Sequence, residues 1–510
     1  MHSFKRLIAL ILAAVLCAGC FCAFAETSFR YEGDGFDTPE EAALCYVAGL
    51  KNLDLEQMLS AFAWETQVDH FDFKAYITRL KGIDPITVPG MPVFSDLSRS
   101  ANIEQFRGFQ TNYICLAVEC FVNDELINAP ARSLVFQEEG ELDEYLERCD
   151  NGRLESLAEM TNIRIYSPDD VTEGKFSLEQ NLESFARENA RYGADEVRAV
   201  FITFDIGWET YAVSPTVARY GDKWYVVSVS SRIPMMLGID SNHQAFFGVP
   251  DELRDLLEDA EPSMKVTELP AASGRRISYE EGFSSPEEAV NRYFEGLKNG
   301  DVQQMLSAFA WETQADRYSL KENAEWAKAI TYDGPVRMQI PNAFMTELNL
   351  GSLRYRQSRR IYTAVRVYIM EDAEKYADLL TGFRINLDEE EVDDFVGVFD
   401  NGKAEKLQTL DNVRLIDPGT VLERYNIDTI RNRLETHQRI YGADEIREVL
   451  AVAEMDGGTL VFNPVLVRYG EKWYIASVEG AAFFILSIEA TRQALIHVNG
   501  PVDDFLLSGQ

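Results

Sequence analysis

Residues that could do chemistry occur in duplicate in this sequence. The string MLSAFAWETQ occupies residues 58–67 and again 305–314, and each copy sets a tryptophan beside a glutamate. Each half also carries an arginine and a tyrosine directly before a Gly-Asp or Gly-Glu turn. Aromatic rings beside charged groups are typical of ligand pockets. The pocket candidates are therefore Trp64, Glu65, Arg219, Tyr220, Trp311, Glu312, Arg468 and Tyr469.

Each candidate also has a purely structural explanation. Trp64 and Trp311 can fill the core between a helix and a sheet, which is the interpretation we favour. Tyr220 and Tyr469 can pack on a sheet, and an arginine next to a turn is usually solvated. The candidates thus predict a binding role and assign no catalytic residue.

Catalytic and metal-binding motifs are missing from the sequence. It contains no G-x-S-x-G, H-E-x-x-H, paired C-x-x-C or phosphate-loop motif. None of the histidines after the N-terminal segment is kept at the equivalent position of the other half, which argues against a shared histidine mechanism. These are His70, His243, His437 and His497. Catalysis by Asp or Glu together with Tyr stays open.

An acidic run at residues 388–394 suggests calcium at first sight. The run lacks the alternating ligand spacing and the glycine of an EF-hand loop. We interpret it as the start of a helix, where the helix dipole favours acids. We expect neither a metal nor a cofactor.

The charge balance limits the partners. The 510 residues include 84 acidic and 48 basic side chains, for a formal net charge of −36. Such a surface repels phosphate backbones and anionic headgroups, so we expect no nucleic acid and no direct headgroup binding.

The N-terminus has the composition of an export signal. Lys5 and Arg6 precede an apolar stretch that ends in Ala23-Phe24-Ala25, which predicts a signal peptide at residues 1–25. Two alternatives are a lipid anchor at Cys20 and an uncleaved anchor at residues 7–25. All three place the folded part outside the cytoplasm, with no membrane contact beyond such an anchor.

Four cysteines follow the signal, an even number in an oxidising compartment. The pairing of Cys45, Cys115, Cys120 and Cys149 stays open, although Cys115 and Cys120 lie five apart on an expected strand and should not pair with each other. The residues aligned with them in the second half are not cysteines: they are Arg292, Thr363, Tyr368 and Phe399. The fold therefore does not depend on disulfides.

The two halves of the chain match over most of their length. GFDTPEEAA returns as GFSSPEEAV, CDNGRLESL as FDNGKAEKL, YGADEVR as YGADEIR, and ARYGDKWYVVSV as VRYGEKWYIASV. A repeat of this size is a domain rather than a solenoid unit. We predict a first α+β domain at residues 26–257, a linker at 258–281 and a second α+β domain at 282–510, each closing its own apolar interior.

Local signals predict the elements of each unit. Thr38-Pro39 and Ser285-Pro286 start a helix, and Asp54 or Asp301 caps a second helix with a capping box completed by Gln57 or Gln304. Strands are expected at YICLAVECFV and IYTAVRVYIM, at VRAVFITFDI and REVLAVAEM, and in the Gly-Asp and Gly-Glu hairpins. Helices are expected at LDEYLERC, at VDDFVGVF, and before Gly193 and Gly442.

The capped helix pair together with the terminal hairpin resembles the nuclear transport factor 2-like superfamily. The resemblance covers the first two helices and the last strands of each unit. It implies helices packed on a curved antiparallel sheet to form a cone, often with a pocket. Members include ketosteroid isomerases, polyketide cyclases and dehydratases, which use pocket Asp, His or Tyr residues, and many non-catalytic modules of exported bacterial proteins.

These observations favour a non-catalytic exported protein whose two domains bind a small ligand, a peptide or an envelope partner. One alternative is an isomerase- or cyclase-like enzyme that uses Asp or Glu and Tyr in a cone pocket. The other is a structural spacer whose duplication extends its reach.

Overall fold

The fold is that of a computed structural model, which describes residues 32–83, 90–171, 191–270, 282–376, 378, 385–421, 428–488, 492–499 and 502. The predicted signal peptide, including Cys20, lies outside these residues. Among the helices of the described ranges, none combines the length and the apolar character needed to cross a bilayer.

The opening helices of each half form as their capping signals predict. α2 (Pro39–Asn52) and α14 (Pro286–Asn299) begin after Thr38 and Ser285, whose hydroxyl oxygens accept from the amides of the third helical residue. α3 (Leu55–Leu59) and α15 (Val302–Leu306) begin after Asp54 and Asp301 in the same way. The predicted capping box of the second helix is wrong, because the Gln57 amide oxygen accepts from Asn52 instead, at 2.8 Å.

A long helix follows in each half where we predicted a strand. α6 (Asp96–Val122) and α18 (Ala343–Met370) contain the segments YICLAVECFV and IYTAVRVYIM. The last nine residues of α6 are all buried, and apart from Glu119 they are apolar, so the segment lacks the alternation of apolar and polar faces that marks a surface helix. Its β-branched and aromatic residues then mimic a buried strand.

The strands of each half form a strongly bent antiparallel arrangement divided into two sheets. In the first half the orders are β10-β3-β5-β6-β9 and β4-β7-β8, and in the second half β13-β15-β16-β19 and β14-β17-β18. The predicted hairpins and the strands before them are confirmed. The bounds in the first half are β3 Thr161–Tyr166, β4 Glu196–Ala199, β5 Phe201–Ile206, β6 Glu209–Val213, β7 Thr216–Tyr220, β8 Lys223–Ser228, β9 Phe247–Gly248 and β10 Met264–Lys265. Those in the second are β13 Asp411–Ile416, β14 Glu445–Glu448, β15 Leu450–Met455, β16 Gly458–Phe462, β17 Val465–Tyr469, β18 Lys472–Ser477 and β19 Ile496–Val498.

Shorter helices complete the two halves. The predicted helices α8 (Glu141–Cys149), α20 (Glu389–Gly397) and α23 (Asp428–Tyr441) are confirmed, whereas the helix before Gly193 lies mostly outside the described residues. Asp388 and Glu391 of the acidic run form a capping box at the start of α20. The remaining helices of the first half are α4 Trp64–His70, α5 Phe73–Leu80, α7 Glu125–Asn128, α9 Arg153–Ser156, α10 Pro168–Val171, α12 Arg232–Met236 and α13 Asp251–Asp259. Those of the second half are α16 Trp311–Arg317, α17 Leu320–Ala327, α21 Lys403–Lys406, α22 Pro418–Val421 and α24 Ala481–Ile485.

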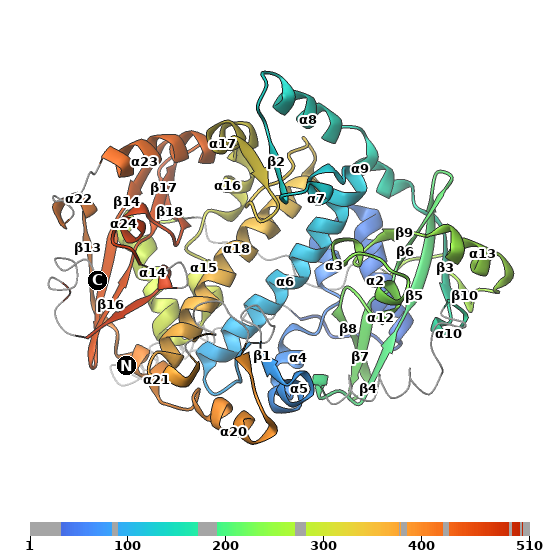
Figure 1. Cartoon of the computed structure of the whole chain (residues 1–510), viewed down its shortest axis with the longest axis horizontal. Coiled ribbons are helices and arrows are strands. Elements are labelled where there is room, and N and C mark those ends of the chain that lie inside the picture. Colours follow the sequence, from blue (N-terminus) through green and yellow to red (C-terminus); the bar gives the residue numbers. More distant parts are fainter. Residues whose placement is uncertain are drawn as a thin grey trace, which may run out of the picture.

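The two halves pack on each other through their long helices. Figure 1 shows α6 and α18 side by side in the middle of the molecule, with the sheets of each half outside them. Two buried ion pairs cross this contact, Arg337–Glu119 at 2.6 Å and Arg354–Glu104 at 3.0 Å. Two short strand pairs also cross it: β1 (Gly82–Ile83) with β12 (Ile385–Asn386), and β2 (Ser133–Val135) with β11 (Ala329–Thr331).

The largest hydrophobic cluster contains residues of both halves. The expectation that each half closes its own interior is therefore wrong: α6 and α18 bury apolar side chains against each other as well as against their own sheets. The predicted domain boundaries stay a prediction. Part of the predicted linker is structured, because β10 pairs with β3.

Equivalent hydrogen bonds in the two halves show which residue of α6 corresponds to which residue of α18. Gln110 accepts from the amide of Val229 and Gln357 from that of Val478, which gives an offset of 247 along α6 and α18. The structural counterparts of Cys115 and Cys120 are therefore Tyr362 and Val367, one residue before those in the sequence alignment. Cys115 and Cys120 lie on a helix, not a strand, and the four described cysteines are buried thiols with no disulfide among them.

Candidate functional site

The duplicated tryptophans fill the core. Trp64 is 0% and Trp311 1% exposed, and each indole N–H donates to a carbonyl five residues earlier. Each ring also stacks on a phenylalanine, Phe62 or Phe309. Their neighbours Glu65 and Glu312 are half-buried and exposed, respectively. This is the core packing that we favoured for the tryptophans.

The hairpin candidates point to opposite faces of the small sheets, because each arginine and its tyrosine are neighbours on one strand. Tyr220 and Tyr469 donate to the carbonyls of Tyr192 and Tyr441, at 3.0 and 2.8 Å. Arg219 and Arg468 donate to the carbonyls of the turn glycines and are about a third exposed. Each arginine lies over the ring of a tryptophan on the next strand, Trp224 or Trp473. The structure therefore separates each arginine from its tyrosine.

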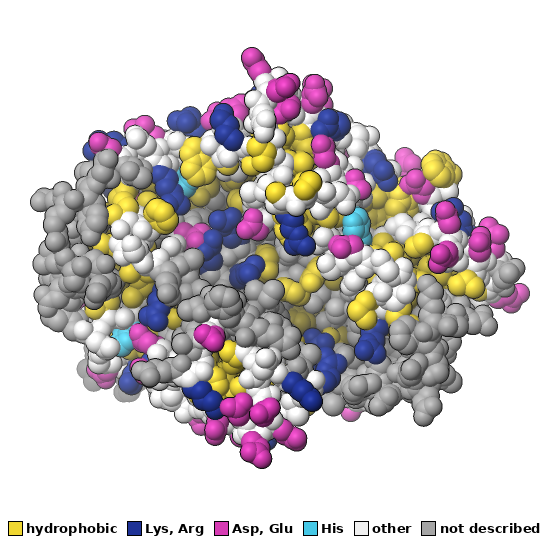
Figure 2. All heavy atoms as spheres, viewed as in Figure 1, with side chains coloured by type: hydrophobic (Ala, Val, Ile, Leu, Met, Phe, Trp, Pro, Cys, Tyr) yellow, Lys and Arg dark blue, Asp and Glu magenta, His cyan; other side chains and the backbone are white. Residues whose placement is uncertain are grey.

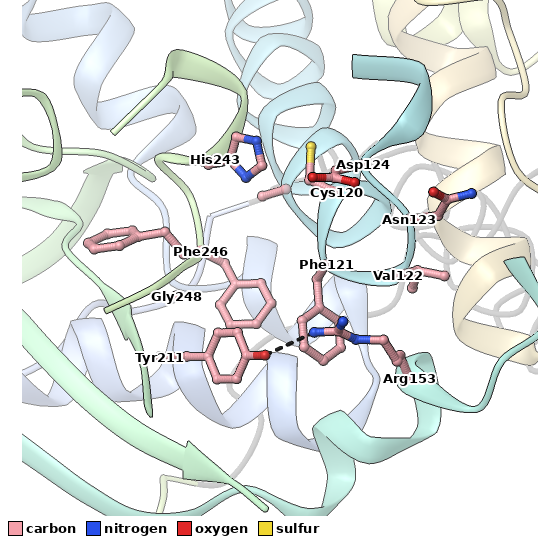
Figure 3. Close-up of a pocket in the computed structure, with 12 residues that line it drawn as sticks. Cys120, Phe121, Val122, Asn123, Asp124, Arg153, Tyr211, His243, Phe246 and Gly248 are labelled. Carbon is pink, nitrogen blue, oxygen red and sulfur yellow. Dashed lines mark hydrogen bonds between the residues drawn. The ribbon is translucent and has the colours of Figure 1, made fainter. Parts of the chain in front are cut away.

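A cavity that none of these candidates lines opens at the C-terminal end of α6 (Figure 3). Its volume is about 340 Å³. The wall is aromatic: the ring centroids of Phe121, Tyr211 and Phe246 lie 5.1–5.3 Å apart. Polar groups at its edge come from α6 and the two residues after it, from α9 and from the 3-10 helix Ser241–His243. They are Cys120, Asn123, Asp124, Arg153 and His243.

Arg153 is the central cation of this cavity. Its guanidinium carbon lies 4.8 Å from the centroid of the Phe121 ring, and Nη2 donates to the Tyr211 hydroxyl at 3.0 Å. That hydroxyl in turn donates to Glu209, which lies 3.6 Å from Arg153. Burial, followed by the Glu209 hydrogen bond, raises the pKa of Tyr211 to about 12. The three groups form a hydrogen-bonded chain along one edge of the aromatic wall.

A short Asn-Gly loop places this cation. Asn151 donates to the carbonyl of Val122 at the end of α6 and accepts from the amide of Arg153. Gly152 adopts φ +75°, a conformation that favours glycine. Asn401, Gly402 and Lys403 repeat the same contacts at the end of α18. Arg153 and Lys403 lie in the duplicated segments CDNGRLESL and FDNGKAEKL. This repeat was the sequence signal for the site.

The equivalent place in the second half is largely filled. The cavity there has a volume of about 140 Å³. Lys403 lies 2.7 Å from Asp372 and 3.5 Å from Glu371, and His497 lies 3.3 Å from Glu371. The strand registers Tyr211–Gly248 and Leu460–His497 show that His497 stands where the first half has Gly248.

Within the described residues, no cluster of three or more His, Cys, Asp or Glu side chains could hold a metal ion. The lining offers an aromatic wall and one guanidinium, with the thiol of Cys120, the carboxyl of Asp124 and the imidazole of His243 at the edge.

Comparison with known proteins places the fold. No protein-family model and no curated protein matches the sequence. Among solved structures, the chain is similar to a cystatin-like protein from Ruminococcus gnavus ATCC 29149, with a TM-score of 0.52 and 14% identity over 92% of this chain and 94% of that one. The chain thus has an α+β fold similar to that of this cystatin-like protein, with helices packed on bent antiparallel sheets.

Proposed function

We propose that this chain is an exported, non-catalytic binding protein that arose by duplication, and that its first half holds a small ligand in the cavity at the end of α6. The ligand has a flat apolar ring that packs on Phe121, Tyr211 and Phe246, and a polar edge that meets Arg153. The export signal at residues 1–25 belongs to the same proposal.

The observation that carries the proposal is the difference between the two equivalent cavities. The first has about 340 Å³ of space, within the usual range for small-molecule sites, whereas the second has about 140 Å³. Side chains could close the first cavity as they do the second, since a Cβ on Gly248 would meet only the Tyr211 ring, at 3.9 Å. The open space is therefore not imposed by the backbone.

Binding fits the cavity better than catalysis does. Arg153, Tyr211 and Glu209 hydrogen-bond or ion-pair with one another. A phenol with a pKa near 12 that donates to a carboxylate is a poor proton donor at neutral pH. The isomerase- or cyclase-like alternative would need one of these groups, or Asp124 or His243 at the edge of the cavity, to exchange a proton with a substrate.

The test is a ligand screen with and without the cavity. Ligand-observed NMR with a library of aromatic and heterocyclic compounds is run on residues 26–510, on Gly248→His, which copies the second half, and on Gly248→Ala as the backbone control. We expect compounds that bind the wild type and Gly248→Ala and are lost in Gly248→His. Compounds that bind all three variants equally, or a library with no binder, would overturn the proposed site.

A further inference from the structure

One face of α18 carries three arginines that the first half lacks. Arg356, Arg359 and Arg360 are spaced so that their side chains neighbour each other on one side of the helix. At the offset of 247 fixed by the glutamine contacts, their counterparts on α6 are uncharged. These are Phe109, Asn112 and Tyr113.

A single carboxylate balances this charge within the described residues. Glu479, whose side chain is 15% exposed, pairs with Arg360 and lies 3.6 Å from Arg356. Arg359 is exposed and makes no ion pair with a described residue. The Nε of Arg360 is buried and has no hydrogen-bond partner. The face therefore has an excess of about two positive charges, in a chain whose net charge is −36.

A fourth arginine approaches from α23. Burial, together with the positive charges of Arg433 and Arg356, which repel the protonated imidazole, lowers the pKa of His437 to about 4. Burial raises the pKa of Tyr441, and the positive charges of Arg356 and Arg433 both oppose that rise. Figure 2 shows Lys and Arg side chains gathered in a hollow over α18, on the face where the two halves meet.

We propose that this face is a binding site for a small multivalent anion, one that carries two or more carboxylate or phosphate groups. The guanidinium fork matches both oxyanions in a bidentate manner. Guanidinium groups that outnumber their carboxylate partners attract an anion with two or three negative charges more strongly than one with a single charge. A long polyanion is excluded, because the strongly acidic surface beyond the hollow would repel it.

This site is independent of the proposed aromatic cavity, because it lies on the second half and uses different residues. The two halves would then hold ligands of different chemistry, a ring in the first and an oxyanion in the second. Failure of one proposal leaves the other standing.

Calorimetric titration tests the site with two probes, citrate for carboxylates and inorganic triphosphate for phosphates, on residues 26–510 at low and at physiological salt. The variants are Arg356→Gln, Arg359→Gln and the double variant. The ion pair between Glu479 and Arg360 is retained in all of these variants, so each of them should fold. The control is Arg254→Gln on α13, which removes one cation from an exposed pair with Asp251 on the other half.

We expect at least one probe to bind, more weakly at higher salt, and each single variant to bind about tenfold more weakly, as for the loss of one charge-assisted contact. The double variant should lose binding while its melting temperature stays within a few degrees of the wild type. Binding of neither probe at low salt would overturn the proposal. Equal weakening by Arg254→Gln and Arg359→Gln would do the same, because it would show attraction by overall charge only.

Discussion

The cavities at the ends of α6 and α18 are surrounded by the same backbone elements but lined by different side chains. The Asn-Gly loop, the cation behind it and the strand pair opposite are present in both halves. In the first half Gly248 leaves space beside an aromatic wall, and in the second His497 and two carboxylates close around Lys403. The comparison teaches that the backbone holding a site can stay fixed while a few lining residues decide whether it is open.

The contact between the long helices shows a second asymmetry. Glu119 on α6 pairs with Arg337, and both side chains are about 5% exposed or less. At the offset of 247, the equivalent residues are Arg366 on α18 and Gly90. Arg366 is 1% exposed, and two of its nitrogens have no hydrogen-bond partner. One side of the contact thus has a complete ion pair, and the other has a guanidinium that lies over the Tyr362 ring with no described carboxylate beside it.

Breaking the complete pair should have the largest effect on stability. Glu119→Gln leaves the buried Arg337 without its counter-charge, and we expect a loss of about 3–5 kcal/mol in the free energy of unfolding. Chemical denaturation measures it. The matched control is Arg366→Met, which removes a buried charge with no described carboxylate beside it and should leave stability unchanged or raise it. Equal losses in the two variants would mean that Arg366 has an anionic partner.

Acid should destabilise the protein through His437, on α23 of the second half. Its folded pKa of about 4 lies below the reference value of 6.5, so the unfolded chain binds the proton first. The stability that His437 contributes is therefore complete above pH 6.5 and is lost as the pH falls to 4, by up to about 3 kcal/mol. Denaturation of wild type and of His437→Gln is measured between pH 7 and 4. Because the carboxylates titrate in both proteins, the difference between the two curves of unfolding free energy against pH gives the contribution of His437. Parallel curves would show that the imidazole is not depressed.

Opening the closed cavity should cost less. His497→Ala removes an imidazole that is 14% exposed and contacts Glu371 and Tyr368, while Glu371 keeps Lys403 and Arg492. We expect a loss of about 1–2 kcal/mol, as for one hydrogen bond and a partly buried ring. The same variant should acquire binding of an aromatic compound only if space alone separates the two cavities. If the variant folds but binds no aromatic compound, the aromatic wall of the first half, and not space alone, makes the first cavity able to bind.

The sequence predicted local features of the fold better than its long-range packing. The caps at Thr38 and Ser285 and the Gly-Asp turn depend on neighbouring residues, so they could be read directly. α6 could not, because it is buried on all sides by partners distant in the sequence. The core packing of Trp64 was favoured from the sequence, whereas the aromatic wall of the cavity was missed, because Phe121, Tyr211 and Phe246 meet only after the chain has folded. Arg153 lay within a duplicated segment that we read as a repeat and not as a site.

The helix caps provide the smallest and most closely matched comparison. Thr38 Oγ1 lies 3.1 Å from the amide of Glu41, and Ser285 Oγ lies 3.2 Å from that of Glu288. Removing either hydroxyl, in Thr38→Ala or Ser285→Ala, should cost about 1 kcal/mol. Because the largest cluster joins both halves, we expect one unfolding transition that each variant shifts equally, with the double variant adding both losses. Two transitions in calorimetry, each moved by only one of the substitutions, would show instead that the halves unfold separately and that the contact between α6 and α18 does not couple them.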